Sequence, residues 1–510
     1  MKNAPSEAGT AGSIFRPGRN CWRVERADRL ALIVDGADYF RALRQAFIQS
    51  KRELLLIGWD FDFELEMLPG ESDDDGNASD GLPNRLGVFL EAVVEQAPDL
   101  HVYILKWNGT ILAAPGRLLP SMALFVFGSD RIHFALDSHH PFGACHHQKI
   151  IAVDGAFAFC GGIDVTEERW DTSEHLSDNP LRVRKDGSPS EPWHDVTSAL
   201  TGPVASGLAQ LSRSRWQRAT GDALDVPDSV DSSIWPEGLE VDSKKVQVAI
   251  ARTEPPYDDE PLVNEIEQLF LDSVRSAQTT IYVESQYFMT KTICDALAAR
   301  LKEDTGPEII VINPESGLSG LEDKAMHVLR GRKIEILKSA DHGDRFRIYA
   351  PVTNADEPIH VHAKIMIVDD KILHIGSSNL DDRSMGFDTE CDVAIEGPSE
   401  LVIGFRSRLL SEHLGVTPED FDKALHDEGS LVATIERLNP SQGRGLRPIV
   451  QLSEGVIGGF FADTRLLDQR YVPGQSTEVG QGLRPRHLAL AAVAAGLGFV
   501  AWKLWQRWKT

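Results

Sequence analysis

The feature that most constrains this chain of 510 residues is a short segment that occurs twice in the same residue frame. Each copy has a histidine that is followed 2, 7 and 14 residues later by a lysine, an aspartate and a glycine. The two copies are His147, Lys149, Asp154 and Gly161, and His362, Lys364, Asp369 and Gly376. The composition predicts about 0.02 such segments by chance, even when any basic or acidic residue is allowed to count. The repeat therefore indicates two related halves.

The secondary-structure patterns also repeat. Apolar runs that are typical of fully buried strands alternate with helical spacing in the same order in both halves. Helices are expected around residues 40–47, 86–95 and 262–274, and strands at 54–59, 101–107, 280–288 and 308–314. Continuous apolar strands between helices are typical of a parallel sheet covered on both faces. The sequence predicts an α/β fold of two similar lobes, each a mostly parallel sheet covered by helices, packed around a pseudo-two-fold axis.

The composition changes along the chain and predicts where the lobes begin and end. A stretch rich in Asp, Ser and Pro is typical of a linker between them. The expected organisation is a flexible N-terminus (1–20), an N-terminal lobe with the first motif at 147–162 (21–220), an acidic linker (221–245), a C-terminal lobe with the second motif at 362–377 (246–415), a polar tail (416–484) and a candidate membrane-anchoring helix (485–508).

The C-terminal helix is predicted from fifteen residues without a charge, Leu488–Trp502. As a helix this run spans about 22 Å, and about 27 Å if it continues past Lys503 to Trp505, against a hydrocarbon layer of about 30 Å. Tryptophans and basic residues at its end are typical of a membrane interface. The alternative is an Ala-rich helix that is buried or binds a partner. Residues 1–20 show no apolar core of signal-peptide length.

Charge and cysteine content exclude several classes of protein. The chain has 52 Lys and Arg against 77 Asp and Glu, a net charge of −25, which opposes binding to nucleic acid. Its five cysteines are too few and too scattered for a disulfide framework or a zinc site, and are expected to be small core residues. No metal and no other cofactor is expected.

The motif residues themselves suggest phosphoryl chemistry. Residues two apart on a strand point to the same side, so His147 projects with Lys149, and His362 with Lys364. A pseudo-two-fold axis would bring both pairs to one pocket. Two lysines neutralise the oxygens of a phosphodiester. One imidazole can attack phosphorus while the other protonates the leaving oxygen and then deprotonates water or an alcohol. The residues alone do not distinguish the nucleophile from the acid.

With these motifs the chain resembles the phospholipase D superfamily, whose signature is the duplicated HxKxxxxDxxxxxxG(G/S) segment. The resemblance extends from about Asn20 to about Gly415 and is closest to bacterial phospholipase D proteins of the eukaryote-like branch. Further similar segments are Gly161–Asp171, Pro192–Val196, Ile281–Phe288, Gly376–Asn379 and Asp382–Met385. One position departs from the family pattern, because Ser285 replaces the usual Asn and leaves in doubt any amide hydrogen bond made there.

The resemblance implies a role for each matching residue. His147 corresponds to the nucleophile and His362 to the general acid and base. Asp154 and Asp369 complete the two motifs, and we expect them to orient strand and turn more than to react. The residues expected to hold the phosphoryl oxygens are Lys149, Lys364 and Asn379, with support from Ser377 and Gly162. The carboxylates expected to orient the two histidines are Asp195 and Glu390.

The implied function is that of a phospholipase D. Such an enzyme hydrolyses the distal phosphodiester bond of glycerophospholipids such as phosphatidylcholine through a phosphohistidine, releasing phosphatidic acid and the headgroup alcohol. The alternative is a cardiolipin synthase-like phosphatidyltransferase that uses the same intermediate. A superfamily nuclease is opposed by the acidic charge, and a catalytically silent, membrane-tethered interaction module by the intact motifs. The expected partner is phospholipid at a membrane surface, and the expected catalytic unit is a monomer. The expected location is the cell envelope, through the C-terminal helix; the alternative is secretion by a signal-independent route.

Overall fold

The computed structural model describes residues 12–109, 128–227, 233–315 and 320–449. The described residues all belong to one compact unit. The predicted anchoring helix at 485–508, residues 1–11 and the part of the predicted tail at 450–484 lie outside the described residues. Within the described ranges, no helix combines the length and the apolar character needed to span a bilayer.

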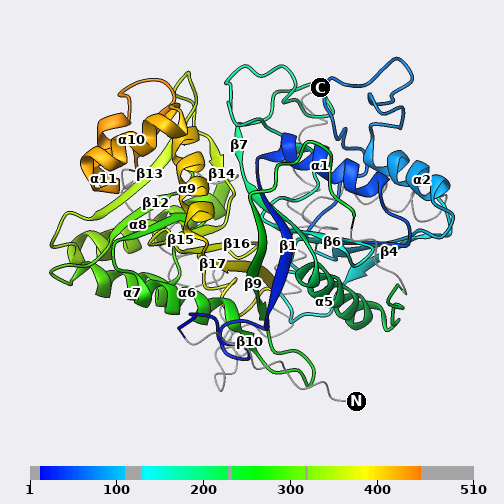
Figure 1. The fold of residues 1–510 in the computed structure, drawn as a ribbon, viewed down its shortest axis with the longest axis horizontal. Coiled ribbons are helices and arrows are strands. Elements are labelled where there is room, and N and C mark those ends of the chain that lie inside the picture. Colours follow the sequence, from blue (N-terminus) through cyan, green and yellow to red (C-terminus); the bar gives the residue numbers. More distant parts are fainter. Residues whose placement is uncertain (1–11, 110–127, 228–232, 316–319, 450–510) are drawn as a thin grey trace, which may run out of the picture. The chain divides into compact units, whose positions relative to one another are not determined.

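The described fold is built on one sheet of sixteen strands. Strands β1 (Arg23–Val34) and β9 (Ser243–Glu254) pair antiparallel and join the two halves at the middle of the sheet (Figure 1). The first half adds β8 (Val196–Thr201), β6 (Phe157–Gly161), β5 (Ile150–Val153), β2 (Glu53–Gly58), β3 (His101–Trp107) and β4 (Ile132–Asp137), in that order outward from β1. The second half adds β17 (Glu390–Glu396), β16 (Ile372–Gly376), β15 (Ile365–Val368), β11 (Thr280–Glu284), β12 (Glu308–Ile312), β13 (Phe346–Val352) and β18 (Gly445–Pro448) outward from β9, and β10 (Val263–Asn264) pairs with β9.

The strand order is the same on the two sides of the β1–β9 pair, as the duplicated sequence predicts, and the α/β class is confirmed. The expectation of mostly parallel lobes is wrong. Only β2–β3–β4 and β11–β12–β13 run parallel, and the other neighbours in this sheet are antiparallel. The reason is local, because each motif forms a hairpin. In β5–β6 the turn is made by Asp154 and Gly155, both at positive φ, so the chain reverses directly instead of crossing over through a helix.

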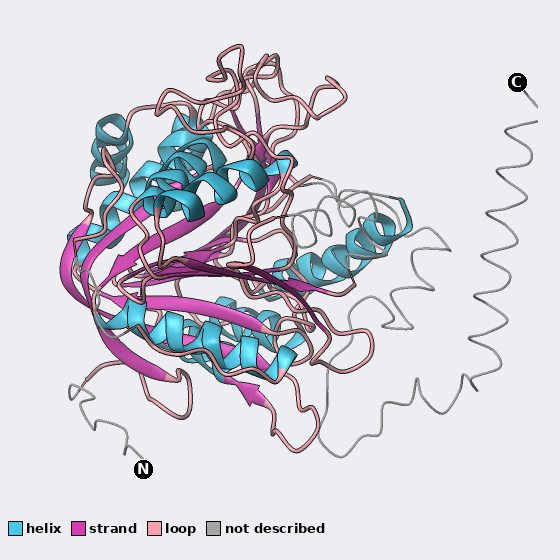
Figure 2. Cartoon of the chain, turned by 90° about the vertical axis from the view of Figure 1, so that its right-hand side faces the viewer, coloured by secondary structure: helices cyan, strands magenta, loops and turns pink. Residues whose placement is uncertain are grey.

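Helices cover both faces of the sheet (Figure 2). Helices α1 (Gly36–Ile48) and α2 (Leu86–Gln96) pack on one face of the first half, and α6 (Glu265–Ser276), α7 (Lys291–Leu301) and α8 (Gly320–Ala340) do so in the second. Helices α5 (Pro203–Thr220) and α9 (Ser399–Leu414) share one core with strands of both halves. A core that is continuous across the join makes the two halves one folding unit. All five cysteines are free, and four are buried in the core as expected.

Three predicted boundaries are corrected by the structure. The N-terminus is not flexible over residues 12–20, because Phe15 is buried and the side chain of Asn20 bonds to Ile14 O and to Asp272, both at 2.9 Å. The linker is not a free connection over residues 233–245. Ile234 is buried in the core of the first half, and residues from Ser243 onward already belong to β9.

The predicted polar tail is also wrong over residues 416–449. This segment forms α10 (Pro418–Glu428), α11 (Leu431–Leu438) and β18, and its apolar side chains enter the core that both halves share. The hydroxyls of Thr417 and Ser430 each accept a backbone N–H at 3.1 Å and cap the two helices. Such caps, followed by helical spacing of apolar residues, are a signal that the composition of the segment concealed.

The motif aspartates fasten each hairpin to its neighbouring strand. Asp154 accepts the backbone N–H groups of residues 51–53 at 2.8–2.9 Å, just where β2 begins. Asp369 does the same for residues 278–280 at 2.7–3.0 Å, at the start of β11. Both carboxylates therefore accept hydrogen bonds from the backbone at a turn. We therefore assign Asp154 and Asp369 a structural role and no longer count them among the catalytic residues. This role agrees with the expectation that they orient strand and turn.

Replacing Asp154 or Asp369 by alanine should lower the free energy of unfolding by about 3 kcal/mol, because three backbone donors lose a charged acceptor. The measurement is urea unfolding followed by circular dichroism. Asp258 is an exposed aspartate that also has positive φ, so Asp258→Ala controls for the backbone conformation. An equal decrease in the free energy of unfolding in all three variants would contradict the structural role of Asp154 and Asp369.

Candidate active site

The two motifs are brought together by short backbone pairings between the halves. The backbone N–H of His147 donates to Thr389 O at 3.0 Å, and that of His362 donates to His194 O at 2.8 Å. The second contact extends a parallel pair, β7 (Trp193–His194) with β14 (His360–Val361). Each motif histidine is therefore held beside the residue that precedes a carboxylate of the opposite half.

Those carboxylates contact the imidazoles. His147 Nδ1 lies 2.9 Å from Glu390 Oε2, and His362 Nδ1 lies 2.6 Å from Asp195 Oδ2. Both carboxylates are completely buried. A carboxylate at Nδ1 fixes the tautomer and leaves Nε2 of each ring for the reacting group. The structure thus places Asp195 and Glu390 where orienting groups are needed, each on the histidine of the other half.

The motif lysines surround the same place. Lys149 Nζ lies 3.2 Å from Asp164 Oδ1, and Lys364 Nζ donates to His362 O. Both lysines are buried, and each influences the histidine of the opposite half, since Lys364 lowers the pKa of His147 and Lys149 lowers that of His362. The side chain of Lys364 also reaches the first motif, because a Cβ at Gly162 would lie 3.3 Å from Lys364 Cδ. The structure therefore assembles both histidine–lysine pairs into one site.

Burial controls the protonation of the site. It lowers the pKa of both His147 and His362 well below the ordinary value, with the nearby ammonium groups acting in the same direction. It raises the pKa of Glu390 to about 8 and that of Asp195 to about 6. Without a bound anion, the imidazoles are therefore neutral. The His147 side chain is 16% exposed and that of His362 is 6% exposed, so His147 is the more accessible.

Two residues expected to support phosphate binding lie against the orienting carboxylates. The Ser377 hydroxyl donates to Glu390 Oε2 at 2.5 Å, and Ser384 donates to Glu390 Oε1 at 2.7 Å. At the equivalent position of the first half, the N–H of Gly162 donates to Val196 O. A Cβ at Gly162 would lie only 2.3 Å from Asp195 Oδ1, so this position excludes any side chain. The phosphate contacts expected of Ser377 and Gly162 stay predictions.

Asn379 and Ser285 lie together beside the second motif. Asn379 is buried, and its Oδ1 has no hydrogen-bond partner among the described residues. It occupies the motif position that Asp164 holds in the first half, next to Lys149. The Ser285 hydroxyl accepts the backbone N–H of Leu380 at 3.1 Å. At this position, where the family pattern has an amide, the hydroxyl therefore fixes the loop that carries Asn379.

Three more side chains belong to the site, and sequence reasoning missed two of them, Arg169 and Asp164. The ring of Trp193 contacts those of His360 and His362, at centroid distances of 4.4 and 5.1 Å, and the guanidinium of Arg169 lies 4.0 Å from the Trp193 centroid. Asp164 pairs with Lys149. All three belong to segments that resemble family motifs, which was the available signal. Trp193 is buried by these contacts and has no open face for a headgroup cation.

Comparisons with known proteins agree with this arrangement. Residues 134–296 match the family model described as Phospholipase D, and residues 270–409 match the one described as Cardiolipin synthase, PLD-like domain. The chain is 24% identical to Phospholipase D A of Dictyostelium discoideum over 78% of its own length and 37% of the relative's. It is 24% identical to Phospholipase D alpha 1 of Arabidopsis thaliana over 54% of its length and 50% of the relative's. The chain thus spans half or less of the length of these relatives.

The fold has a counterpart among solved structures. The phosphatidylserine synthase of Haemophilus influenzae superposes with a TM-score of 0.52 at 12% identity, over 80% of this chain and 94% of that protein. The site contains two histidine–lysine pairs, and a carboxylate of the opposite half orients the histidine of each pair. The chain belongs to the phospholipase D superfamily.

Replacing Glu390 by glutamine should lower the turnover of a phosphodiester substrate about 10²–10⁴-fold, because an amide does not stabilise positive charge on His147. The variant should fold, since the amide keeps the shape of the carboxyl group. The measurement is the initial rate beside a thermal unfolding curve. Glu400→Gln, an exposed glutamate on α9, is the control. Activity within a few-fold of the unmodified protein would show that Glu390 does not assist His147.

Proposed function

We propose that this protein is a phospholipase D-type phosphodiesterase that cleaves the distal phosphodiester bond of glycerophospholipids such as phosphatidylcholine. The observation that carries the proposal is the pair of imidazoles, each with Nδ1 against a buried carboxylate of the opposite half and with lysines beside it. Such a site can bind one phosphodiester anion between two ammonium groups and offer it a nucleophile and an acid.

The proposed reaction has two steps. His147 Nε2 attacks phosphorus, a P–N bond forms, the P–O bond to the headgroup breaks, and His362 donates a proton to the departing alkoxide. Water then attacks phosphorus and gives its proton to His362, the P–N bond breaks, and phosphatidic acid leaves. Binding of the anionic phosphodiester offsets the ammonium charges that lower the pKa of His362, so that His362 is more readily protonated when substrate is bound.

Phosphatidyl transfer is the second candidate. The intermediate is the same, and the acceptor is a lipid alcohol instead of water. The match of residues 270–409 to the model described as Cardiolipin synthase, PLD-like domain supports this alternative. Both reactions need the same first step, so the fate of the phosphohistidine distinguishes them.

The proposal extends to the setting of the enzyme. We propose that the catalytic unit is a monomer and that the segment at 485–508 attaches it to a membrane at the cell envelope, which would keep it at its substrate. Secretion by a signal-independent route is the alternative. The sequence motifs also support placement in the bacterial, eukaryote-like branch of the superfamily.

Headgroup release from phosphatidylcholine vesicles tests the function. The unmodified protein should release choline, and His147→Ala should release none. His362→Ala should accumulate a phosphatidyl adduct on His147, which mass spectrometry detects as an added phosphatidyl mass. Lipid analysis with and without phosphatidylglycerol separates hydrolysis from transfer, because transfer yields a larger phospholipid in place of phosphatidic acid. Equal release by the His147 variant would overturn the proposal.

The pH dependence of the reaction follows from Lys364. Burial lowers its pKa to about 8, and the ammonium form is the one that neutralises the phosphodiester. The value of kcat/KM should therefore fall as pH rises through about 8, where an ordinary lysine would stay charged. The measurement is kcat/KM for choline release across neutral and alkaline pH. In Lys364→Arg the side chain stays charged, so kcat/KM should not fall in this pH range, whatever the absolute rate. An unchanged fall of kcat/KM at alkaline pH in that variant would assign the titration to another group.

A further inference from the structure

A second cluster of buried histidines and carboxylates lies outside the catalytic machinery. Asp35, His175, His194 and Glu412 each offer one atom, and these four atoms lie within 4.8 Å of one another. Three of the residues come from the first half, and Glu412 comes from α9 of the second. We propose that this cluster is a structural site for a divalent transition metal ion of the zinc type. The inference does not rest on the proposed lipid chemistry.

Four contacts between the imidazoles and the carboxylates, which involve both oxygens of Asp35, lie near the ligand separations of a tetrahedral ion. His175 Nε2 lies 3.1 Å from Glu412 Oε1 and 3.5 Å from Asp35 Oδ2. His194 Nδ1 lies 3.0 Å from Glu412 Oε1 and 3.2 Å from Asp35 Oδ1. Ligands bound at 2.0–2.1 Å in a tetrahedron are about 3.3 Å apart, which is the middle of this range. Imidazole nitrogens and carboxylate oxygens are ligands that zinc accepts.

Two of these atoms make no hydrogen bond in the structure. Among the described residues, His194 Nδ1 and Asp35 Oδ2 have no hydrogen-bond partner and lie within ion-pair distance only of other members of the cluster, although His194 is completely buried and Asp35 is 1% exposed. Buried polar atoms are normally paired, because an unpaired one costs about 1–3 kcal/mol. A central ion would satisfy both atoms together.

The far nitrogen of each imidazole is already engaged by a carboxylate. His175 Nδ1 lies 2.8 Å from Asp171 Oδ2, and Asp171 is itself held by Arg182 at 2.9 Å. His194 Nε2 lies 2.8 Å from Glu284 Oε2. Metal-binding histidines usually donate their other N–H to such a carboxylate, which turns the lone pair of the near nitrogen toward the ion. Both histidines of the cluster have this arrangement.

The charge of the cluster is compatible with a divalent ion. With neutral imidazoles, Asp35 and Glu412 bring a charge of −2 into a buried place, and one divalent cation neutralises it. Two protons, one on each imidazole, would give the same net charge and are the competing arrangement. The group of His194, Glu284 and His413 is a poorer candidate, because Glu284 is already bonded to Tyr282, His194 and His413.

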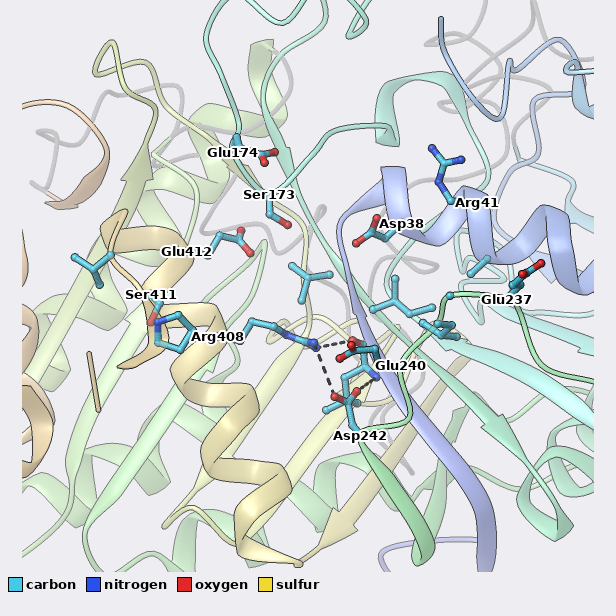
Figure 3. Close-up of a pocket in the computed structure, with 18 residues that line it drawn as sticks. Asp38, Arg41, Ser173, Glu174, Glu237, Glu240, Asp242, Arg408, Ser411 and Glu412 are labelled. Carbon is cyan, nitrogen blue, oxygen red and sulfur yellow. Dashed lines mark hydrogen bonds and ion pairs between the residues drawn. The ribbon is translucent and has the colours of Figure 1, made fainter. Parts of the chain in front are cut away.

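An ion could enter through a neighbouring cavity of about 590 Å³. Glu412 lines it together with Glu174, Asp38, Glu240 and Asp242 (Figure 3). The cations among its lining residues are Arg41 and Arg408, so acidic groups predominate there. An acidic approach raises the local concentration of cations.

The site would act on catalysis through the backbone. Asp35 N donates to Asp195 O at 2.8 Å, and Asp195 N donates to Asp35 Oδ1 at 3.2 Å. Asp195 orients His362, and His194 is its direct neighbour in the chain. An ion held by Asp35, His194 and Glu412 would therefore fix the position of Asp195 and join the two halves. These cluster residues are positioning residues and take no part in proton transfer.

Metal content of the full chain tests the proposal. After treatment with a chelator and dialysis, the protein should take up one Zn²⁺ per chain, measured by inductively coupled plasma mass spectrometry, and its Tm should rise. Co²⁺ should give the visible absorption bands of a tetrahedral ion. No uptake, no change in Tm and no Co²⁺ bands in folded protein would overturn the proposal and assign the cluster to protons.

Variants distinguish this site from weak binding to surface carboxylates. Glu412→Gln should weaken Zn²⁺ binding at least tenfold, whereas Glu174→Gln, which alters the same cavity outside the cluster, should bind normally. If Glu412→Gln does not fold, Asp171→Asn serves instead and should weaken binding about 10–100-fold. Equal affinity in the Glu412 or Asp171 variant and the unmodified protein would show that the ion binds elsewhere. None of these readouts depends on lipid turnover.

Discussion

The structure depends on two contacts in which a carboxylate of one half binds the motif histidine of the other half. Glu390 of the second half engages His147 of the first, and Asp195 of the first half engages His362 of the second. Neither half alone would have an oriented histidine. Buried carboxylate–imidazole pairs are costly unless their geometry is held closely. The β1–β9 pair and the core shared by α5 and α9 supply that geometry, since they make the two halves one continuous body.

The pseudo-symmetry breaks at the residues that surround the imidazoles. Asp195 is short and lies against Gly162, where no side chain fits, whereas the longer Glu390 is held by the hydroxyls of Ser377 and Ser384. The first half places Asp164 beside Lys149, and the second half has Asn379 at the same motif position. Two histidines in identical surroundings would have identical proton affinities. These differences give each ring its own environment, which an attacking base and a proton donor require.

Sequence reasoning predicted the features that depend on local pattern. Strands such as β3 and β12, and the paired motifs, follow from apolar runs and fixed spacing. The antiparallel join of β1 and β9 was missed, because it depends on pairing between residues about 220 positions apart. The helices after Gly415 were concealed by their polar outer faces. The cluster of Asp35, His175, His194 and Glu412 has no regular spacing at all, and only the folded chain brings these four residues together.

The catalytic dyads and the second cluster meet at one short segment, His194–Asp195. His194 points toward Asp35 and Glu412, while Asp195 points toward His362, and the reciprocal hydrogen bonds between Asp35 and Asp195 lock the two backbones together. Glu412 of α9 contacts the segment that carries Asp195 through His194. The position of His362 is thus coupled to the packing of the two halves. Correct assembly of the halves is a condition for an oriented His362, and a half-assembled chain would not have a competent site.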